Sequence, residues 1–131
     1  MKTRVVCAGT FDILHTGHIE YLKNSKALSK NSELIVIVAR DINSERIKGK
    51  KPINNENIRL KNIQSLNFVD NVILGSDVKF NPINTIASLN PDIIALGHDQ
   101  WAKEEWLSSS LKEIGITPKI VRMPQFEKRP L

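Results

Sequence analysis

Short runs of apolar, mostly β-branched residues alternate along this chain with longer stretches in which apolar positions recur every three or four residues. An uninterrupted apolar run of this length is typical of a strand that is covered on both faces. The pattern predicts five such strands, over residues 4–8, 33–39, 69–75, 92–97 and 117–122. Helical spacing predicts four helices, over residues 16–28, over 57–66, from 81 or 84 to about 90, and over 103–114.

The strict alternation of strands and helices predicts the fold class. Parallel strands joined by right-handed helical crossovers form a doubly wound sheet with helices on both faces. We therefore expect an α/β fold with a five-stranded parallel sheet. No internal repeat, linker or low-complexity segment interrupts the pattern, so a single domain is expected over residues 1–131.

The amino-acid composition limits the expected cellular location and the expected class of binding partner. One cysteine cannot form an internal disulfide, and no apolar run has the length of a membrane span or a signal peptide, so we expect a cytoplasmic protein without a membrane partner. A net charge of +5 raises nucleic acid as a partner. However, the basic residues are dispersed except at 46–51, and neither zinc-finger spacing nor an RNA-recognition aromatic motif is present. A nucleoside triphosphate explains a local basic loop equally well, so nucleic acid is the less favoured partner.

The stretch that carries chemistry is residues 9–18, which read GTFDILHTGH. It follows the first predicted strand and opens the first predicted helix. Free N–H groups and the positive dipole end make a helix start a binding place for phosphate. Gly9 allows the backbone to approach a ligand closely, and Thr16 is expected to be the N-cap.

Two imidazoles, those of His15 and His18, flank this predicted anion site. Such a pair suits charge that builds up on a phosphorus centre. Two structural histidines or a zinc site are the alternatives, but zinc requires a third and usually a fourth ligand. The candidates for these are Cys7, inside a predicted buried strand, and His98, far along the chain. The strand–turn–helix context favours phosphate chemistry.

The motif GTFDxxHxGH resembles the signature of the cytidylyltransferase-like nucleotidyltransferases of the HxGH class. This resemblance implies a Rossmann-like sheet, and transfer of a nucleoside monophosphate from a triphosphate to a phosphate-bearing acceptor with release of pyrophosphate. Residues 38–41, 48–53 and 73–76 look most like the archaeal-type FAD synthetase branch, which implies ATP and FMN as substrates. Glycerol-3-phosphate cytidylyltransferases, which use CTP, are the next most similar branch. The resemblance further implies Mg²⁺ with the triphosphate and a homodimer.

The resemblance also implies roles for individual residues. His15, His18 and Lys48 would be catalytic, although Lys50 and Lys51 compete with Lys48 for the phosphate. The residues placed at the nucleotide are Gly9, Thr10, Phe11, His15, Gly17, His18, Arg59, Gly97 and Asp99. The residues placed at the acceptor are Asp12, Arg40 and Asp41, and no side chain is assigned to a metal. We expect Trp101 to cover the core rather than to stack on a ligand, and the basic residues around Lys48 to lie in a polar loop.

Residues 123–131 depart from the family pattern. Relatives continue after the fifth strand with an arginine-containing segment and a Ser/Thr-rich turn into a last helix that helps to hold the triphosphate. Without that turn, either the protein extends beyond this sequence or the nucleotide site lacks one wall. In the second case Arg122 or Arg129 would supply the missing cation. A non-catalytic protein that binds nucleotide or nucleic acid is the competing class, but simple anion binding does not require two imidazoles.

Overall fold

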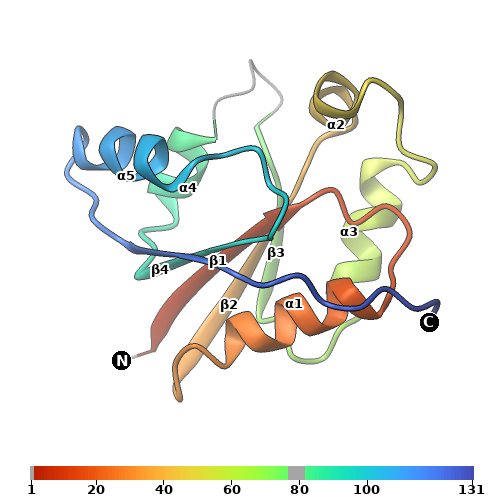
Figure 1. Ribbon diagram of the computed structural model, residues 1–131, viewed down its shortest axis with the longest axis horizontal. Helices are drawn as coiled ribbons and strands as arrows, with labels where there is room; N and C mark the ends of the chain where they lie inside the picture. Colours follow the sequence, from red (N-terminus) through yellow and green to blue (C-terminus); the bar gives the residue numbers. More distant parts are fainter. Residues whose placement is uncertain (1, 77–81) are drawn as a thin grey trace.

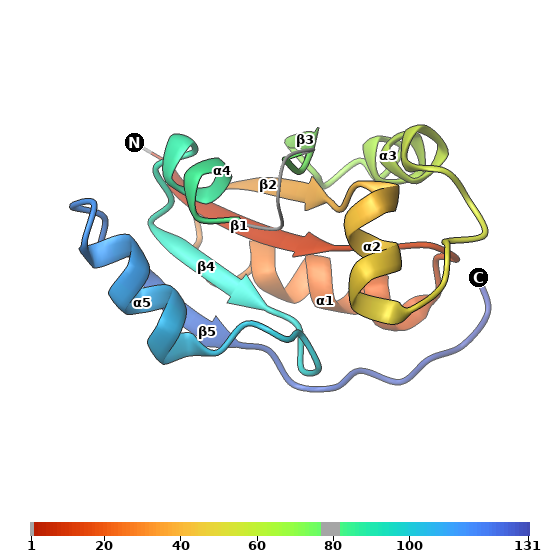
Figure 2. The same cartoon turned by 90° about the horizontal axis from the view of Figure 1, so that it is seen from above.

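The computed structural model describes residues 2–76 and 82–131, and its five strands form one parallel sheet in the order β3-β2-β1-β4-β5 (Figures 1 and 2). The strands are β1 (Thr3–Gly9), β2 (Ser32–Val38), β3 (Asn71–Leu74), β4 (Ile93–Leu96) and β5 (Lys119–Arg122). The helices are α1 (Thr16–Lys26), α2 (Asp41–Lys48), α3 (Glu56–Gln64), α4 (Ile83–Ser88) and α5 (Glu104–Lys112). The predicted α/β class with a doubly wound five-stranded parallel sheet is confirmed. The predicted helix start at Asn81 lies outside the described residues.

Both faces of the sheet are covered, which explains why its strands read as uninterrupted apolar runs. Neighbouring residues of a strand point to opposite faces, so Val5 packs under α1 and α3 while Val6 packs under α4 and α5 (Figure 1). Leu22 of α1 and Leu111 of α5 are completely buried at these two interfaces. None of the described helices combines the length and apolar character needed to span a bilayer.

The strand order places a crevice at one edge of the sheet. From the central strand β1 the chain turns first toward β2 and β3 and later toward β4 and β5. The connections therefore diverge at the carboxyl ends of β1 and β4, and such a switch point is where ligands bind in open α/β sheets. The loops that follow β1, β2 and β4 meet at this edge (Figure 2).

Residues 41–48 form helix α2, whereas the sequence analysis expected a polar loop there. Only two of its residues, Ile42 and Ile47, are large and apolar, so no hydrophobic stripe indicated a helix. The helix lies beyond the carboxyl ends of the strands rather than on a face of the sheet (Figure 1). Its end signals are present nonetheless, because Asp41 opens the first turn and Gly49, with φ of 77°, closes the last.

One buried arginine ties together three of the loops around the crevice. Arg59 of α3 is fully buried. Its guanidinium donates hydrogen bonds of 2.6–3.0 Å to three backbone carbonyls and one carboxylate, those of Asn54, Thr10, Ala39 and Asp41. A planar group with five N–H donors is suited to gathering acceptors from several segments.

Replacing this side chain tests its structural role. Arg59→Met leaves three carbonyls and a carboxylate without their donor, so we expect the free energy of unfolding to fall by about 3 kcal/mol or more. Urea unfolding followed by circular dichroism measures the change. The control Arg46→Met, at an exposed position of α2, should shift it by less than about 0.5 kcal/mol. Equal stability of the two variants would contradict the assignment.

Candidate active site

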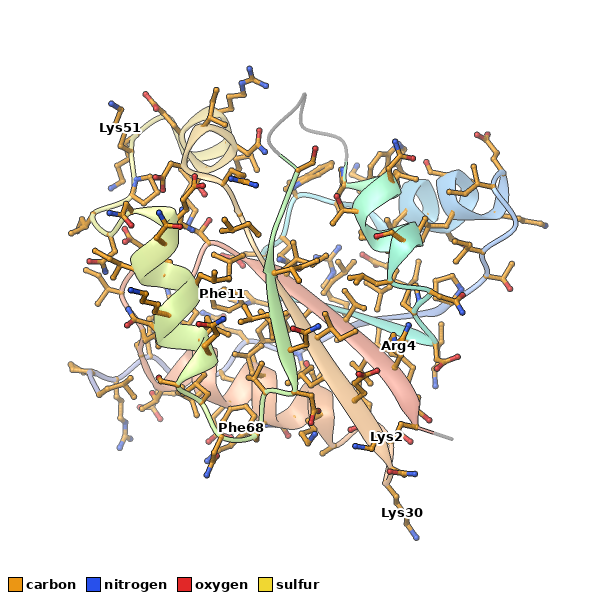
Figure 3. The ribbon with its side chains drawn as sticks, turned by 180° about the vertical axis from the view of Figure 1, so that it is seen from behind. Lys2, Arg4, Phe11, Lys30, Lys51 and Phe68 are labelled. Carbon is orange, nitrogen blue, oxygen red and sulfur yellow. The ribbon has the colours of Figure 1, made fainter. Side chains whose placement is uncertain are left out.

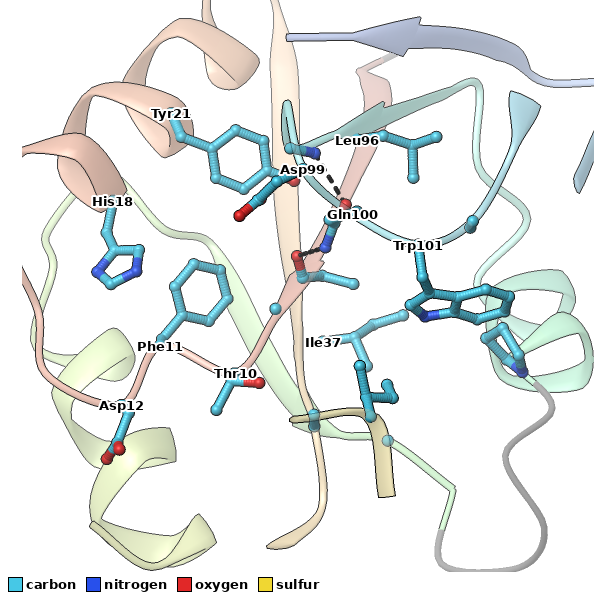
Figure 4. A pocket seen from close by; sticks show the side chains of 18 of the residues that line it. Thr10, Phe11, Asp12, His18, Tyr21, Ile37, Leu96, Asp99, Gln100 and Trp101 are labelled. Atoms are coloured by element: carbon cyan, nitrogen blue, oxygen red, sulfur yellow. Dashed lines mark hydrogen bonds between the residues drawn. The ribbon is translucent and has the colours of Figure 1, made fainter. Parts of the chain in front are cut away.

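A cavity of about 540 Å³ opens at the crevice (Figure 4). This volume is in the range of about 300–1,000 Å³ that is typical of small-molecule sites. Its walls come from the loops after β1, β2 and β4, the first turns of α1, helices α2 and α4, and residues 124–128. All site residues predicted from the sequence border this cavity except Asp41 and Arg59.

His15 and His18 hold each other at the start of α1. Their rings are stacked, with 3.7 Å between centroids and 17° between planes. The backbone N–H of His18 donates to Nδ1 of His15, and the backbone N–H of His15 donates to Nδ1 of His18, both at 3.3 Å. His15 is therefore the N-cap, and the prediction that Thr16 fills this role is wrong. The sequence did not indicate that His15 is the N-cap, because histidine is not among the usual N-cap residues.

These two hydrogen bonds determine where the protons of the imidazoles lie. A nitrogen that accepts from a backbone N–H carries no proton of its own, so each neutral ring must be protonated at Nε2. Each histidine therefore presents an N–H donor on the ring edge opposite the helix backbone. Because both rings border the cavity, the site has a pair of neutral donors beside the helix start.

The surroundings keep both imidazoles uncharged near neutral pH. Burial, followed by the charges of His15, Lys128 and Lys48, lowers the pKa of His18 to about 4, and Asp99 opposes this only in part. Burial and the charge of Lys128 also lower the pKa of His15. At pH 7 the positive charge of the site therefore comes from its lysines rather than from its histidines.

An aromatic side chain in an unusual backbone conformation supports the pair. Phe11 has φ of 54°, a value that is rare for residues other than glycine, asparagine and aspartate. Its ring meets that of His18 edge-on at 5.4 Å and stacks on Tyr21 at 6.5 Å. A Cβ at Gly9 would lie 2.8 Å from this ring, and one at Gly17 would lie 2.9 Å from the ring of His15. Both glycines thus make room for the aromatic side chains of the site.

Two lysines reach the cavity from opposite directions. Lys48 closes α2, and Lys128 belongs to the C-terminal segment; both border the cavity and both lower the pKa of His18. Of the three lysines that competed for the phosphate, Lys48 borders the cavity, whereas Lys50 and Lys51 lie outside its lining, and Lys51 projects from the outer edge of the protein (Figure 3). The sequence analysis did not identify Lys128.

Neither arginine that was considered as the missing cation lies in the cavity wall. Arg122 donates to the carbonyls of Gly97, Gln100 and Ala102 and is paired with Glu104, so it holds the loop after β4. Arg129 is 70% exposed and paired with the carboxylate of Glu127 at 3.0 Å.

The C-terminal segment forms part of the cavity wall. It runs back from β5 to the start of α1 (Figure 2), and Pro124, Phe126 and Lys128 border the cavity. Thr16 holds it there: its backbone N–H donates to the carbonyl of Arg129 at 3.0 Å, and its hydroxyl accepts from the Arg129 N–H at 2.9 Å. Residues 124–128 therefore line part of the cavity, although the segment contains neither a Ser/Thr-rich turn nor a helix.

The side chains predicted to bind the acceptor are engaged with neighbouring loops. The carboxylate of Asp12 accepts from the backbone N–H groups of residues 53–54, both at 2.8 Å. Arg40 donates to the carbonyl of Gly75 and to the carboxylate of Glu56, both at 2.9 Å. Both side chains border the cavity and hold its walls in place.

Asp41 and Arg59 lie behind that wall. Asp41 accepts from the guanidinium of Arg59 at 2.6 Å and from the backbone N–H of Glu56 at 3.2 Å. The sequence analysis placed Arg59 at the phosphates of the nucleotide. In the structure its donors are directed at protein acceptors, so contact with a phosphate would require it to leave them.

The loop after β4 is held in shape by Gln100, which the sequence analysis did not single out. Its side chain accepts from the Gly97 N–H at 2.8 Å and donates to the carbonyl of Ala8 in β1. Gly97 and Asp99 border the cavity from this loop. Trp101 does so too and is 45% exposed, so the expectation that it covers the core is wrong.

The described residues do not form a metal centre. They contain no group of three or more histidine, cysteine, aspartate or glutamate side chains that could hold a metal ion. Burial raises the pKa of the Cys7 thiol to about 11. This thiol inside the sheet is therefore protonated at neutral pH, and it belongs to no such group among the described residues.

Comparison with known proteins identifies the family. Residues 6–130 match the family model described as cytidylyltransferase-like. The FAD synthase of Korarchaeum cryptofilum is 46% identical over 127 residues, which cover 96% of this chain and 84% of that protein. The FAD synthase of Thermoplasma volcanium is 48% identical, with coverage of 95% and 84%. A crystal structure from Thermoplasma volcanium, described as a lipopolysaccharide core biosynthesis protein, has 46% identity and a TM-score of 0.88 over 97% of this chain and 100% of its own. The chain belongs to the cytidylyltransferase-like family.

Proposed function

We propose that this protein is an FMN adenylyltransferase, which joins ATP and FMN to form FAD and pyrophosphate. The observation that carries the proposal is the pair of neutral imidazoles, His15 and His18, whose Nε2–H donors lie beside the start of α1 in a cavity with two lysines. The choice of ATP and FMN is supported by relatives named FAD synthase that are 41–48% identical over most of the chain.

The reaction needs no covalent intermediate with the protein. An oxygen of the FMN phosphate attacks the α-phosphorus of ATP, and the bond from that phosphorus to the oxygen that bridges to the β-phosphorus breaks. The bonding electrons leave with pyrophosphate. The FMN phosphate is largely anionic at neutral pH, because the second pKa of a phosphate monoester is about 6. No general base is therefore required, and catalysis rests on positioning and on the stabilisation of charge.

The described residues supply both contributions. His15 and His18 would donate their Nε2–H groups to oxygens of the α-phosphate as negative charge builds up there, which they can do without losing a proton. Lys48 and Lys128 would neutralise the remaining phosphates. Donors that are fixed before the reaction need no rearrangement in the transition state, which is why such groups contribute strongly to rate.

Three further expectations complete the proposal. Mg²⁺ would enter as MgATP, held chiefly by phosphate oxygens, because this ion is commonly bound through substrate phosphates and retained water. We also propose a cytoplasmic location and a homodimer, both of which derive from the sequence analysis.

The substrates are tested by measuring product formation with purified protein. We expect ATP and FMN with Mg²⁺ to yield FAD and stoichiometric pyrophosphate, with kcat/KM at least about tenfold above that for CTP with glycerol 3-phosphate, a difference of about 1.4 kcal/mol. FAD is resolved by chromatography and pyrophosphate by a coupled assay. Absence of pyrophosphate release with ATP and FMN, or a preference for the other pair, would contradict the proposal. Salt-sensitive DNA binding without turnover would favour a binding protein instead.

The protonation state of the site is tested by NMR titration of His18. Because its pKa in the folded protein lies below the ordinary value of 6.5, we expect a neutral Nε2–H tautomer at pH 6. The unfolded chain then binds the proton first, so this group's contribution to stability is complete above about pH 6.5 and is lost as pH falls toward 4.

A matched pair of lysine variants identifies the electrostatic cause. Lys128→Gln should raise the pKa of His18 because it removes a nearby positive charge. Lys119→Gln, at the exposed start of β5, should leave it unchanged. A cationic His18 at pH 6.5, or equal effects of the two variants, would show that the imidazoles are not held neutral in this way.

A further inference from the structure

The cavity has two chemically different ends. Histidines and lysines line one end, where the proposed phosphoryl transfer takes place. The other end lies around Trp101, and large apolar side chains line it, of which Ile37, Ile86 and Leu96 pack in one cluster. Figure 4 shows His18 and Trp101 on opposite sides of the cavity, with Phe11 and Ile37 between them. The proposed phosphoryl transfer gives no role to the apolar side chains at the second end.

Some apolar side chains that border the cavity remain partly exposed. Trp101 in the loop after β4 is 45% exposed, and Ile47 of α2 is 46% exposed, although both border the cavity. The indole of Trp101 is supported by Trp106, whose ring lies 5.3 Å away at 48°. An indole in a cavity wall is suited to packing against a planar ring.

A buried amide at the cavity wall has an acceptor without a donor. Asn43 of α2 borders the cavity and is only 5% exposed. Its Nδ2 donates to the carbonyl of Ser76 at 2.8 Å. That carbonyl can only accept, so the orientation of the amide is determined, and Oδ1 must be an acceptor. No residue that the structure describes donates to this oxygen. A buried acceptor of this kind calls for a partner.

We propose that the apolar end binds the isoalloxazine ring of FMN and that Oδ1 of Asn43 accepts a hydrogen bond from an N–H or O–H of the flavin. This inference rests on the proposed function. One ring of isoalloxazine carries two methyl groups and no hydrogen-bonding atom on its outer edge, which matches the apolar wall. The opposite ring carries an N–H between two carbonyls, which supplies the donor.

The alternative occupant of this end is adenine. Its nitrogen atoms are distributed around the whole perimeter, so apolar walls would leave several of them without partners. The five-carbon chain of FMN also separates its ring from its phosphate, so one molecule can place the ring at the apolar end and the phosphate near the histidines.

Equilibrium binding of FMN, followed by its fluorescence, tests the assignment without reliance on turnover. We expect Asn43→Leu and Trp101→Ala each to raise the dissociation constant of FMN by about tenfold, the upper end of the effect of losing one neutral hydrogen bond for the first variant and one ring contact for the second. Asn57→Leu, at an exposed position of α3 outside the cavity lining, should change it by less than about twofold. The dissociation constant of MgATP should be unchanged in all three variants.

The outcomes separate this inference from the function on which it rests. If the wild-type protein makes FAD but neither Asn43→Leu nor Trp101→Ala weakens FMN binding, the ring site is wrong and the proposed function stands. A loss of MgATP affinity in place of FMN affinity would assign the apolar end to adenine. If the wild-type protein binds FMN, both variants weaken that binding and no FAD forms, the ring site stands and the function fails. Trp101→Ala changes an exposed side chain, so the test does not depend on the folding of Asn43→Leu.

Discussion

The reciprocal hydrogen bonds between His15 and His18 are the interaction on which the site depends. They satisfy two backbone N–H groups at the start of α1 and, by the same contacts, force both imidazoles to carry their protons on the outer nitrogen. The same two hydrogen bonds therefore cap the helix and fix the Nε2–H donors that face the cavity. The motif residues around the pair serve this geometry, because Gly17 leaves room for the ring of His15 and Phe11 packs against the ring of His18.

Arginines and lysines make different contributions to the cavity: arginines fix its shape, and lysines supply its positive charge. Arg59 and Arg122 each gather backbone carbonyls from loops at the carboxyl edge of the sheet, and this fixes the walls of the cavity. Lys48 and Lys128 reach the cavity itself, and their charges add to the effect of burial, which is the main reason that the pKa of His18 is low. A rigid fork of donors suits the first task, whereas a point charge on a flexible stem suits the second, where phosphates must enter and leave.

The features that could be predicted from the sequence are those with a local signature. Apolar runs predicted the five strands because both faces of the sheet are buried, and residues 9–18 indicated the position of the site. Helix α2 lacks an apolar stripe, so the spacing of hydrophobic residues did not predict it. The burial of Arg59, the return of Lys128 to the start of α1 and the unpaired oxygen of Asn43 depend on segments far apart in the chain. No local pattern encodes such contacts.

The most direct test of the account is the kcat for FAD formation in His18→Asn. The amide oxygen of asparagine can replace Nδ1 as the acceptor at the helix start, while the Nε2–H donor is lost. The account predicts a fall in kcat of about 10²–10³ with unchanged MgATP affinity and an unchanged melting temperature; His18→Ala, which also loses the acceptor for the backbone N–H of His15, should be equally inactive and less stable. A kcat for His18→Asn within a few-fold of wild type would contradict the claim that the neutral imidazole stabilises the transferring phosphoryl group.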